Sequence, residues 1–219
     1  MIDTGPFDLH CYSIDWHPSD HVSFIDNIHM RQLHPDSKIQ DPGAAELFQT
    51  VIFTGPPKTE QVLWPRHCQQ NSWGAELHKD LKFHQNAKLI KKGINPDVDS
   101  YSAFFDNAKL GKTGLEEVIR SEGCTDVFVC GIATDVCVGK GKYKMEYEQF
   151  IISFLAYTAF DAQDFGFRTI MIDDCSRGIV NENITSTFDK IKSQFGCVVQ
   201  SSEVKSFTVC INIDDNMFR

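Results

Sequence analysis

The sequence predicts a single-domain α/β protein with a mostly parallel β-sheet that helices cover on both faces. Short runs rich in β-forming residues alternate along the chain with segments of helical periodicity. This alternation indicates βαβ units, because parallel strands must be joined by a crossover connection. The predicted strands are residues 7–14, 87–93, 125–129, 168–174 and 197–200.

Length and composition fit an ordinary globular protein and exclude two classes of partner. The 219 residues are enough for one sizeable core, and 42% of them are hydrophobic. A formal net charge of −9 argues against nucleic acid, whose binding needs clustered Lys and Arg. The most apolar window, residues 150–160, is too short to cross a bilayer, so we expect no membrane partner.

The cysteines indicate a reducing compartment. All eight lack the C-x-x-C spacing of zinc fingers and redox motifs. The residues after Met1 are neither basic nor apolar, so they do not resemble a secretory signal. We therefore expect a cytoplasmic protein, with the nucleus as an alternative.

The first predicted strand leads into a pair of metal-ligand types. Asp15 and His17 are two residues apart, so an extended chain points both side chains to the same side. Pro18 then ends the strand. A carboxylate and an imidazole are both ligands of divalent metals. A solvated strand end is the alternative explanation of this pair.

A long excursion, residues 18–66, shows little regular periodicity and leads into a second set of candidates. His67 would complete a metal set with Asp15 and His17, and Trp64 would provide an aromatic wall beside it. The alternatives are a hydrogen-bonded loop histidine and a tryptophan that only fills the core.

The second predicted strand ends in Lys92. A lysine at a strand end beside a cysteine holds the thiolate form and can transfer protons. The alternative is an ordinary surface lysine.

The segment 130–137 has the pattern of a nucleophile turn. A predicted strand stops at Gly131, and Thr134 and Asp135 favour a helix N-cap, which leaves Cys137 about one turn inside a helix. Backbone N–H groups and the helix dipole lower a thiol's pKa there, as a nucleophilic cysteine requires. The alternative for Cys137 is a small buried residue.

The remaining segments predict helices and an additional strand. We expect a helix over 115–119 with Thr113 as N-cap and Gly123 as C′ residue, and another over 158–162 that ends at Gly166. Residues 184, 188, 191 and 195 form one apolar helix face, which Gly196 closes. Alternating apolar residues over 207–213 predict an additional strand in a C-terminal tail, 207–219, after a domain spanning 1–206.

Three weak signals meet at one edge of the predicted sheet. Asp15 with His17, Lys92 and the 131–137 turn all follow the carboxyl ends of predicted strands. Parallel sheets bind their ligands at that edge. The signals therefore support one another.

Taken together, the motifs resemble the nicotinamidases of the isochorismatase-like cysteine hydrolase family, especially the animal type. The resemblance covers nearly all of residues 7–206. It is carried by residues 13–24 (SIDWHPSDHVSF), 63–68 (LWPRHC), 73–76 (WGAE), 92–97 (KGINPD), 101–104 (YSAF) and 131–137 (GIATDVC).

The resemblance implies a three-layer, Rossmann-like fold and an amidohydrolase in NAD salvage. It implies that Cys137 attacks the carboxamide of nicotinamide, ammonia leaves, and the thioester is hydrolysed to nicotinic acid. Lys92 would be the cationic member of the triad. Asp15, His17 and His67 would hold a divalent metal, commonly zinc. Trp64, Ala133 and Tyr101 would contact the substrate, Ala133 through its N–H after a cis Ile132–Ala133 peptide. A homo-oligomer is compatible with the resemblance.

Two departures from the family pattern are expected to affect activity. The chain starts at what would be the second strand of the family, so the first strand and its general-base aspartate are expected to be missing. Residues 139–155 interrupt the helix after Cys137; we interpret them as a retained short intron or as a genuine insertion that forms a flap or a partner surface. A catalytically inactive isoform and a hydrolase of another small amide are therefore the alternatives.

Overall fold

The computed structural model of the chain describes residues 5–133, 154–178, 181–195 and 197–205. Its helices are α1 (Leu115–Ser121), α2 (Phe154–Asp164) and α3 (Asn181–Phe195), with short 3₁₀ helices at Ile25–Met30, Pro42–Ala44 and Trp73–Ala75. Its strands are β1 (Cys11–Asp15), β2 (Thr50–Phe53), β3 (Thr59–Val62), β4 (Lys88–Lys92), β5 (Asp126–Val129), β6 (Arg168–Ile172) and β7 (Val198–Val199).

The predicted α/β fold with parallel strands is confirmed. Within the described residues the parallel strands form two separate ladders, β1–β4 and β5–β6–β7, where the sequence predicted one sheet. The register of the first ladder places Asp15 opposite Lys92, at the carboxyl ends of both strands. Two candidate site residues thus become neighbours.

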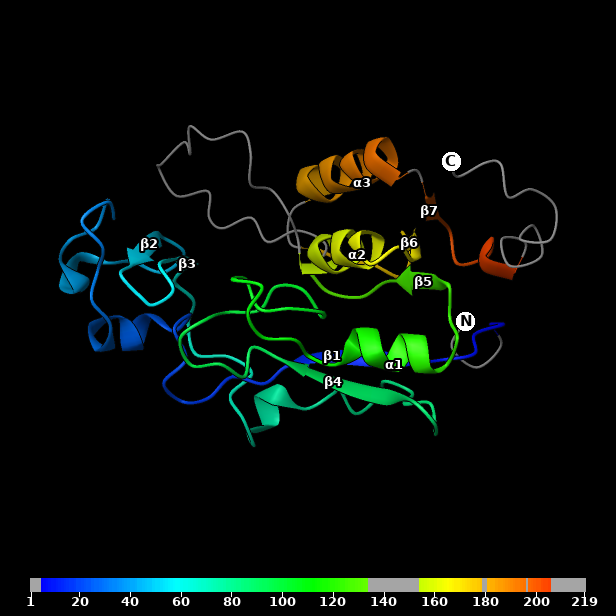
Figure 1. Ribbon diagram of the computed structural model, residues 1–219, viewed down its shortest axis with the longest axis horizontal. Coiled ribbons are helices and arrows are strands. Elements are labelled where there is room, and N and C mark those ends of the chain that lie inside the picture. The colour runs from blue at the N-terminus through cyan, green and yellow to red at the C-terminus, as the bar shows by residue number, and fades with distance from the viewer. Residues whose placement is uncertain (1–4, 134–153, 179–180, 196, 206–219) are drawn as a thin grey trace.

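Strand β6 is the central, buried strand of the second ladder. Ile170, Met171 and Ile172 are at most 1% exposed, as expected for a parallel strand that is buried on both faces. Helices α2 and α3 pack against each other, and α2 packs on β5 and β6 (Figure 1). Val129, Met171 and Ile191 lie in the core between them.

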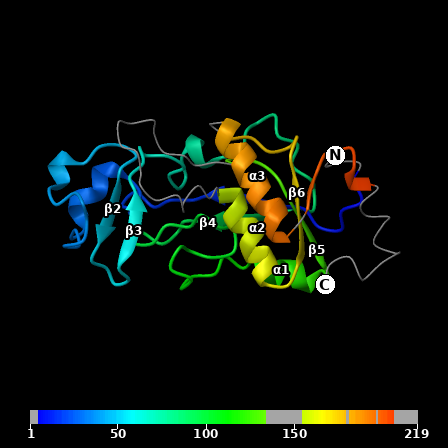
Figure 2. The same ribbon diagram turned by 90° about the horizontal axis from the view of Figure 1, so that it is seen from above.

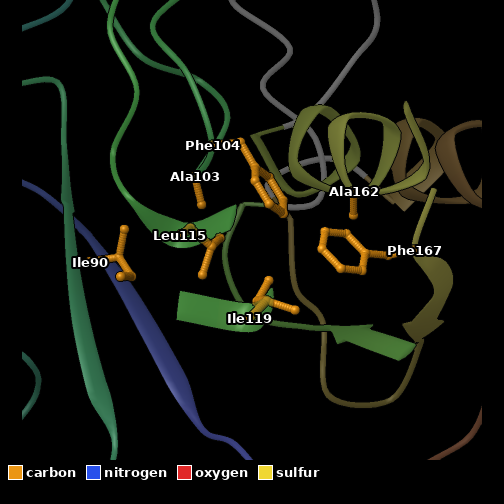
Figure 3. Packing of buried hydrophobic residues seen from close by; sticks show 7 residues of the cluster. All are labelled: Ile90, Ala103, Phe104, Leu115, Ile119, Ala162 and Phe167. Atoms are coloured by element: carbon orange, nitrogen blue, oxygen red, sulfur yellow. The ribbon is translucent and has the colours of Figure 1, made fainter. Parts of the chain in front are cut away.

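One hydrophobic cluster connects the two parallel ladders. Ile90 of β4 packs with Leu115 and Ile119 of α1 and with Ala162 of α2. Figure 3 shows these side chains converging, together with three others of the cluster. Burial of such side chains provides the main stabilisation that holds β1–β4 against the helices.

The antiparallel pair β2–β3 was not predicted. It lies within the long excursion, and both Figures 1 and 2 show it at one end of the molecule, away from the three α-helices. Val51 and Phe53 alternate with less buried neighbours and pack with Val22, Ile28 and Leu63. Each strand is only four residues long, the shortest run in which alternation predicts a strand, and Gly55-Pro56-Pro57 lies between them.

The helix boundaries need two corrections. Gly114, with φ of 90°, is the N-cap of α1. The Thr113 hydroxyl donates to the carbonyl oxygen of Ala103 and accepts from the N–H of Leu115 at 3.2 Å. Helix α2 begins at Phe154, before the predicted 158–162 segment. Most of the predicted insertion 139–155, the predicted tail strand 207–213 and the closing Gly196 lie outside the described residues.

Among the described residues, none of the helices combines the length and the apolar character that a membrane span requires.

Candidate metal centre and active site

Asp15, His17 and His67 form one cluster, as the sequence predicted. One ligand atom from each residue lies within 4.8 Å of the corresponding atoms of the other two. Asp15 is the last residue of β1, and His17 follows two residues later. The 67–70 segment is tied to His17 by two backbone hydrogen bonds, His17 N to Cys68 O at 3.0 Å and Gln70 N to His17 O at 2.8 Å. These bonds bring His67 beside His17, with the ring centroids 4.9 Å apart.

The two histidines present the nitrogen that a metal requires. Nδ1 of His17 lies 2.9 Å from the carbonyl oxygen of Gly93, and Nδ1 of His67 lies 2.8 Å from that of Pro65. A carbonyl oxygen only accepts, so both Nδ1 atoms carry the proton and Nε2 is the basic nitrogen in each ring. Burial lowers the pKa of His17, which keeps the ring neutral. The donor set fits a divalent metal such as zinc.

Gly93 is a site residue that the sequence analysis missed. Its φ is +64°, and a Cβ at this position would lie 2.3 Å from Cε1 and 2.5 Å from Nδ1 of His17. The imidazole of His17 therefore occupies the space that any side chain at residue 93 would need. The sequence did contain one indication of this role: Gly93 directly follows Lys92, a candidate catalytic residue at the end of a predicted strand.

Lys92 is buried at the same edge of the sheet. Its ammonium group forms an ion pair with Oδ1 of Asp15 and donates to the carbonyl oxygen of Ser100 at 2.8 Å. Only 8% of Lys92 is exposed, so the surface-lysine alternative is excluded. The expected contact with Cys137 involves a residue outside the described ranges, so it stays a prediction.

A second, fully buried cluster adjoins the first, because the two share His17. His17, His21 and Asp99 each offer one potential ligand atom within 4.8 Å of the others. The rings of His17 and His21 stack at 4.0 Å, and burial lowers the pKa of His21 to about 3. Asp99 accepts from Gln61 Nε2 at 3.0 Å and from the Ser100 N–H at 2.7 Å. The sequence analysis missed His21 and Asp99 as site residues.

Trp64 lies next to the metal cluster. Its ring centroid is 6.3 Å from that of His67, and its backbone is held by hydrogen bonds with Ser23 and Ile25 at 2.7 and 2.9 Å. Tyr101 contacts helix α2, where its ring centroid lies 5.5 Å from that of Tyr157. Burial raises the pKa of Tyr101 well above its ordinary value, so its hydroxyl stays protonated. Their contacts with substrate stay predictions.

Ala133 follows the turn after β5. The Ile132–Ala133 peptide bond is cis, as the resemblance implies. The turn is tied to the loop after β6 by a hydrogen bond from Arg177 N to Gly131 O at 2.9 Å. Ala133 is the last described residue before the 134–153 gap, so its geometry relative to Cys137 is untested.

The fold and this donor set define an α/β protein with a carboxylate–imidazole metal centre at the carboxyl edge of parallel strands. Residues 25–203 match the family model described as the Isochorismatase domain. The chain belongs to the isochorismatase family.

Nicotinamidases are among the relatives of this chain. It is 35% identical over 167 residues to the nicotinamidase of Escherichia coli and 35% identical over 173 residues to that of Acinetobacter baylyi. The matches cover 76% and 79% of this chain but only 62% and 65% of those relatives' lengths.

Solved structures agree with this assignment. The yeast nicotinamidase bound to the inhibitor nicotinaldehyde superimposes with a TM-score of 0.68 at 26% identity, covering 89% of this chain and 81% of that one. The pyrazinamidase of Pyrococcus horikoshii in complex with zinc gives 0.58 at 26% identity, covering 88% and 75%.

Proposed function

We propose that this chain is a nicotinamidase, which hydrolyses nicotinamide to nicotinic acid and ammonia and thereby serves NAD salvage. The observation that carries the proposal is the cluster of Asp15, His17 and His67 beside the buried Lys92, in a chain whose relatives are nicotinamidases. The yeast relative binds nicotinaldehyde, which shares the pyridine ring of the proposed substrate.

Asp15, His17 and His67 would hold a divalent metal, with zinc as the proposed ion because a neighbouring structure contains it. When bound, the metal would supply a Lewis acid that fixes the pyridine nitrogen. Trp64 would stack on the ring, and Tyr101 would line the same pocket. These residues together orient the carboxamide towards the turn that carries Cys137.

The proposed chemistry passes through a thioester on Cys137. The sulfur attacks the carboxamide carbon, the C–N bond breaks, and the nitrogen leaves as ammonia after taking up a proton. Water then attacks the thioester, releasing nicotinic acid and restoring the thiol. Lys92 would stabilise the thiolate, and the N–H groups of Ala133 and Cys137 would stabilise the oxyanion.

The described cysteines support this choice of nucleophile indirectly. All six are free thiols, and desolvation by burial raises the pKa of every one of them. A raised pKa makes a thiol a poor nucleophile at neutral pH. Free thiols also suit a reducing compartment, so we place the protein in the cytoplasm, with the nucleus as the alternative.

Ammonia release from nicotinamide by the zinc-loaded chain tests the proposal. We expect turnover that disappears in Cys137→Ala and persists in Cys130→Ala, whose thiol follows β5 directly. Pyrazinamide serves as a second substrate, because one neighbour is a pyrazinamidase. Zinc binding without ammonia release from either amide would instead support the catalytically inactive alternative.

A further inference from the structure

Phe48 adopts a backbone conformation that its residue type disfavours. Its φ is +70°, a region that bulky residues rarely occupy. Gln49 N donates to Glu46 O at 3.3 Å, so residues 46–49 form a turn with Phe48 in third place. A positive φ at that place normally selects glycine or asparagine. A phenylalanine that adopts this unfavourable φ is expected to make a side-chain contact that compensates for the strain.

The side chain of Phe48 lies against Trp64. Phe48 N donates to Leu63 O at 2.7 Å and Leu63 N donates to Gln49 O at 2.9 Å, which prolongs the β2–β3 pairing up to the residue before Trp64. The two rings meet edge to face, with centroids 5.5 Å apart and planes at 77°. This is a favourable aromatic geometry.

Phe48 does not behave as a core residue. It remains 40% exposed, whereas its backbone partner Leu63 is fully buried in the β2–β3 core. Trp64 also neighbours His67 of the metal cluster, with the two ring centroids 6.3 Å apart. Trp64 is therefore in ring contact with the half-exposed Phe48 and also neighbours a candidate metal ligand.

We propose that Phe48 is a positioning residue, which holds the Trp64 indole in the plane that stacks on a flat aromatic carboxamide. This assignment rests on the proposed function, in which Trp64 contacts the substrate ring. Stacking acts on the ring equally in the bound substrate and in the transition state, so its loss raises KM and leaves kcat unchanged.

Phe48→Gly separates this role from a structural one. Glycine removes the ring and also relieves the positive φ, so we expect an unchanged or higher melting temperature together with a KM for nicotinamide raised about two- to tenfold. Phe48→Tyr keeps the ring and should retain the wild-type KM. Leu47→Gly is the matched control, since Leu47 is the adjacent turn residue and is 43% exposed.

The outcomes are distinguishable. An active wild type whose KM is the same in Phe48→Gly overturns the positioning role alone. A lower melting temperature with unchanged KM identifies Phe48 as a purely structural residue. A wild-type chain without any turnover overturns the proposed function, and the positioning role with it.

Discussion

His17 and Gly93 are in direct contact across two parallel strands. Nδ1 of His17 donates to the Gly93 carbonyl oxygen at 2.9 Å, and the absent Cβ of Gly93 leaves the space that the imidazole occupies. The contact fixes both the protonated nitrogen and the direction of the ring. It therefore connects a backbone feature after β4 to a metal ligand after β1.

Gly93→Ala should displace His17 and weaken metal binding. The new methyl group would lie 2.3 Å from Cε1 of His17, so the ring must move. We expect zinc affinity to fall about 10- to 100-fold, as for other residues that orient a metal ligand. Titration with a competing zinc chelator measures the change.

Gly123→Ala is the matched control for this substitution. Gly123 also has a positive φ, +71°, but a Cβ there would meet no atom within 4 Å. It should cost about 1 kcal/mol of stability through its backbone alone and leave zinc affinity unchanged. Equal losses of zinc affinity in both variants would contradict the steric explanation.

Removing the metal should lower thermal stability and abolish turnover. A metal present at 100 times its dissociation constant stabilises the folded state by about 2.7 kcal/mol. Chelator treatment should thus lower the melting temperature, and added zinc should restore it. His67→Ala should lose this response, while His78→Ala should keep it because His78 is an exposed side chain away from the cluster. An identical chelator response in both variants would exclude His67 as a ligand.

Lys92→Met should reduce kcat about 10²- to 10⁴-fold, the usual range for a group that assists proton transfer. Methionine fills a similar volume but cannot form the ion pair with Asp15 or stabilise a thiolate. Lys91→Met is the matched control. Lys91 is the adjacent lysine in β4, and its side chain points to the other face, where Nζ lies 3.7 Å from the centroid of the Trp16 ring. Steady-state ammonia assays distinguish the two; a Lys92→Met enzyme with wild-type kcat would remove Lys92 from the mechanism.

Alkylation should single out Cys137. Cys11 and Cys130 are exposed residues, but desolvation of their thiols raises the pKa of both to about 11, so few of these thiols are ionised at pH 7. Iodoacetamide at neutral pH should label Cys137 first, and peptide mass spectrometry locates the label. Bound nicotinaldehyde should protect it. Faster labelling of Cys130 would argue against an activated Cys137.

Much of the site could be predicted because its residues follow short local rules. A spacing of two in an extended chain placed Asp15 and His17 on one side, and the end of a β-like run placed Lys92 at the carboxyl edge. The strands β1, β4, β5 and β6 were also predicted, because each is a short run with β-forming residues between turn signals. The predicted N-cap of α1 was wrong: Gly114 takes that position, and the hydroxyl of Thr113 donates to the distant Ala103 carbonyl oxygen, a contact that local sequence rules do not predict.

The sequence alone therefore determined which chemical groups this protein carries and the local order of strands and helices. Tertiary structure decided contacts that the sequence analysis did not predict: Asp99 beside His21, Phe48 on Trp64, and the imidazole of His17 in the space that a Cβ of Gly93 would need. These contacts join residues separated by long stretches of chain. Periodicity reports only which way a side chain points within its own element, whereas the register between elements depends on packing of the whole core.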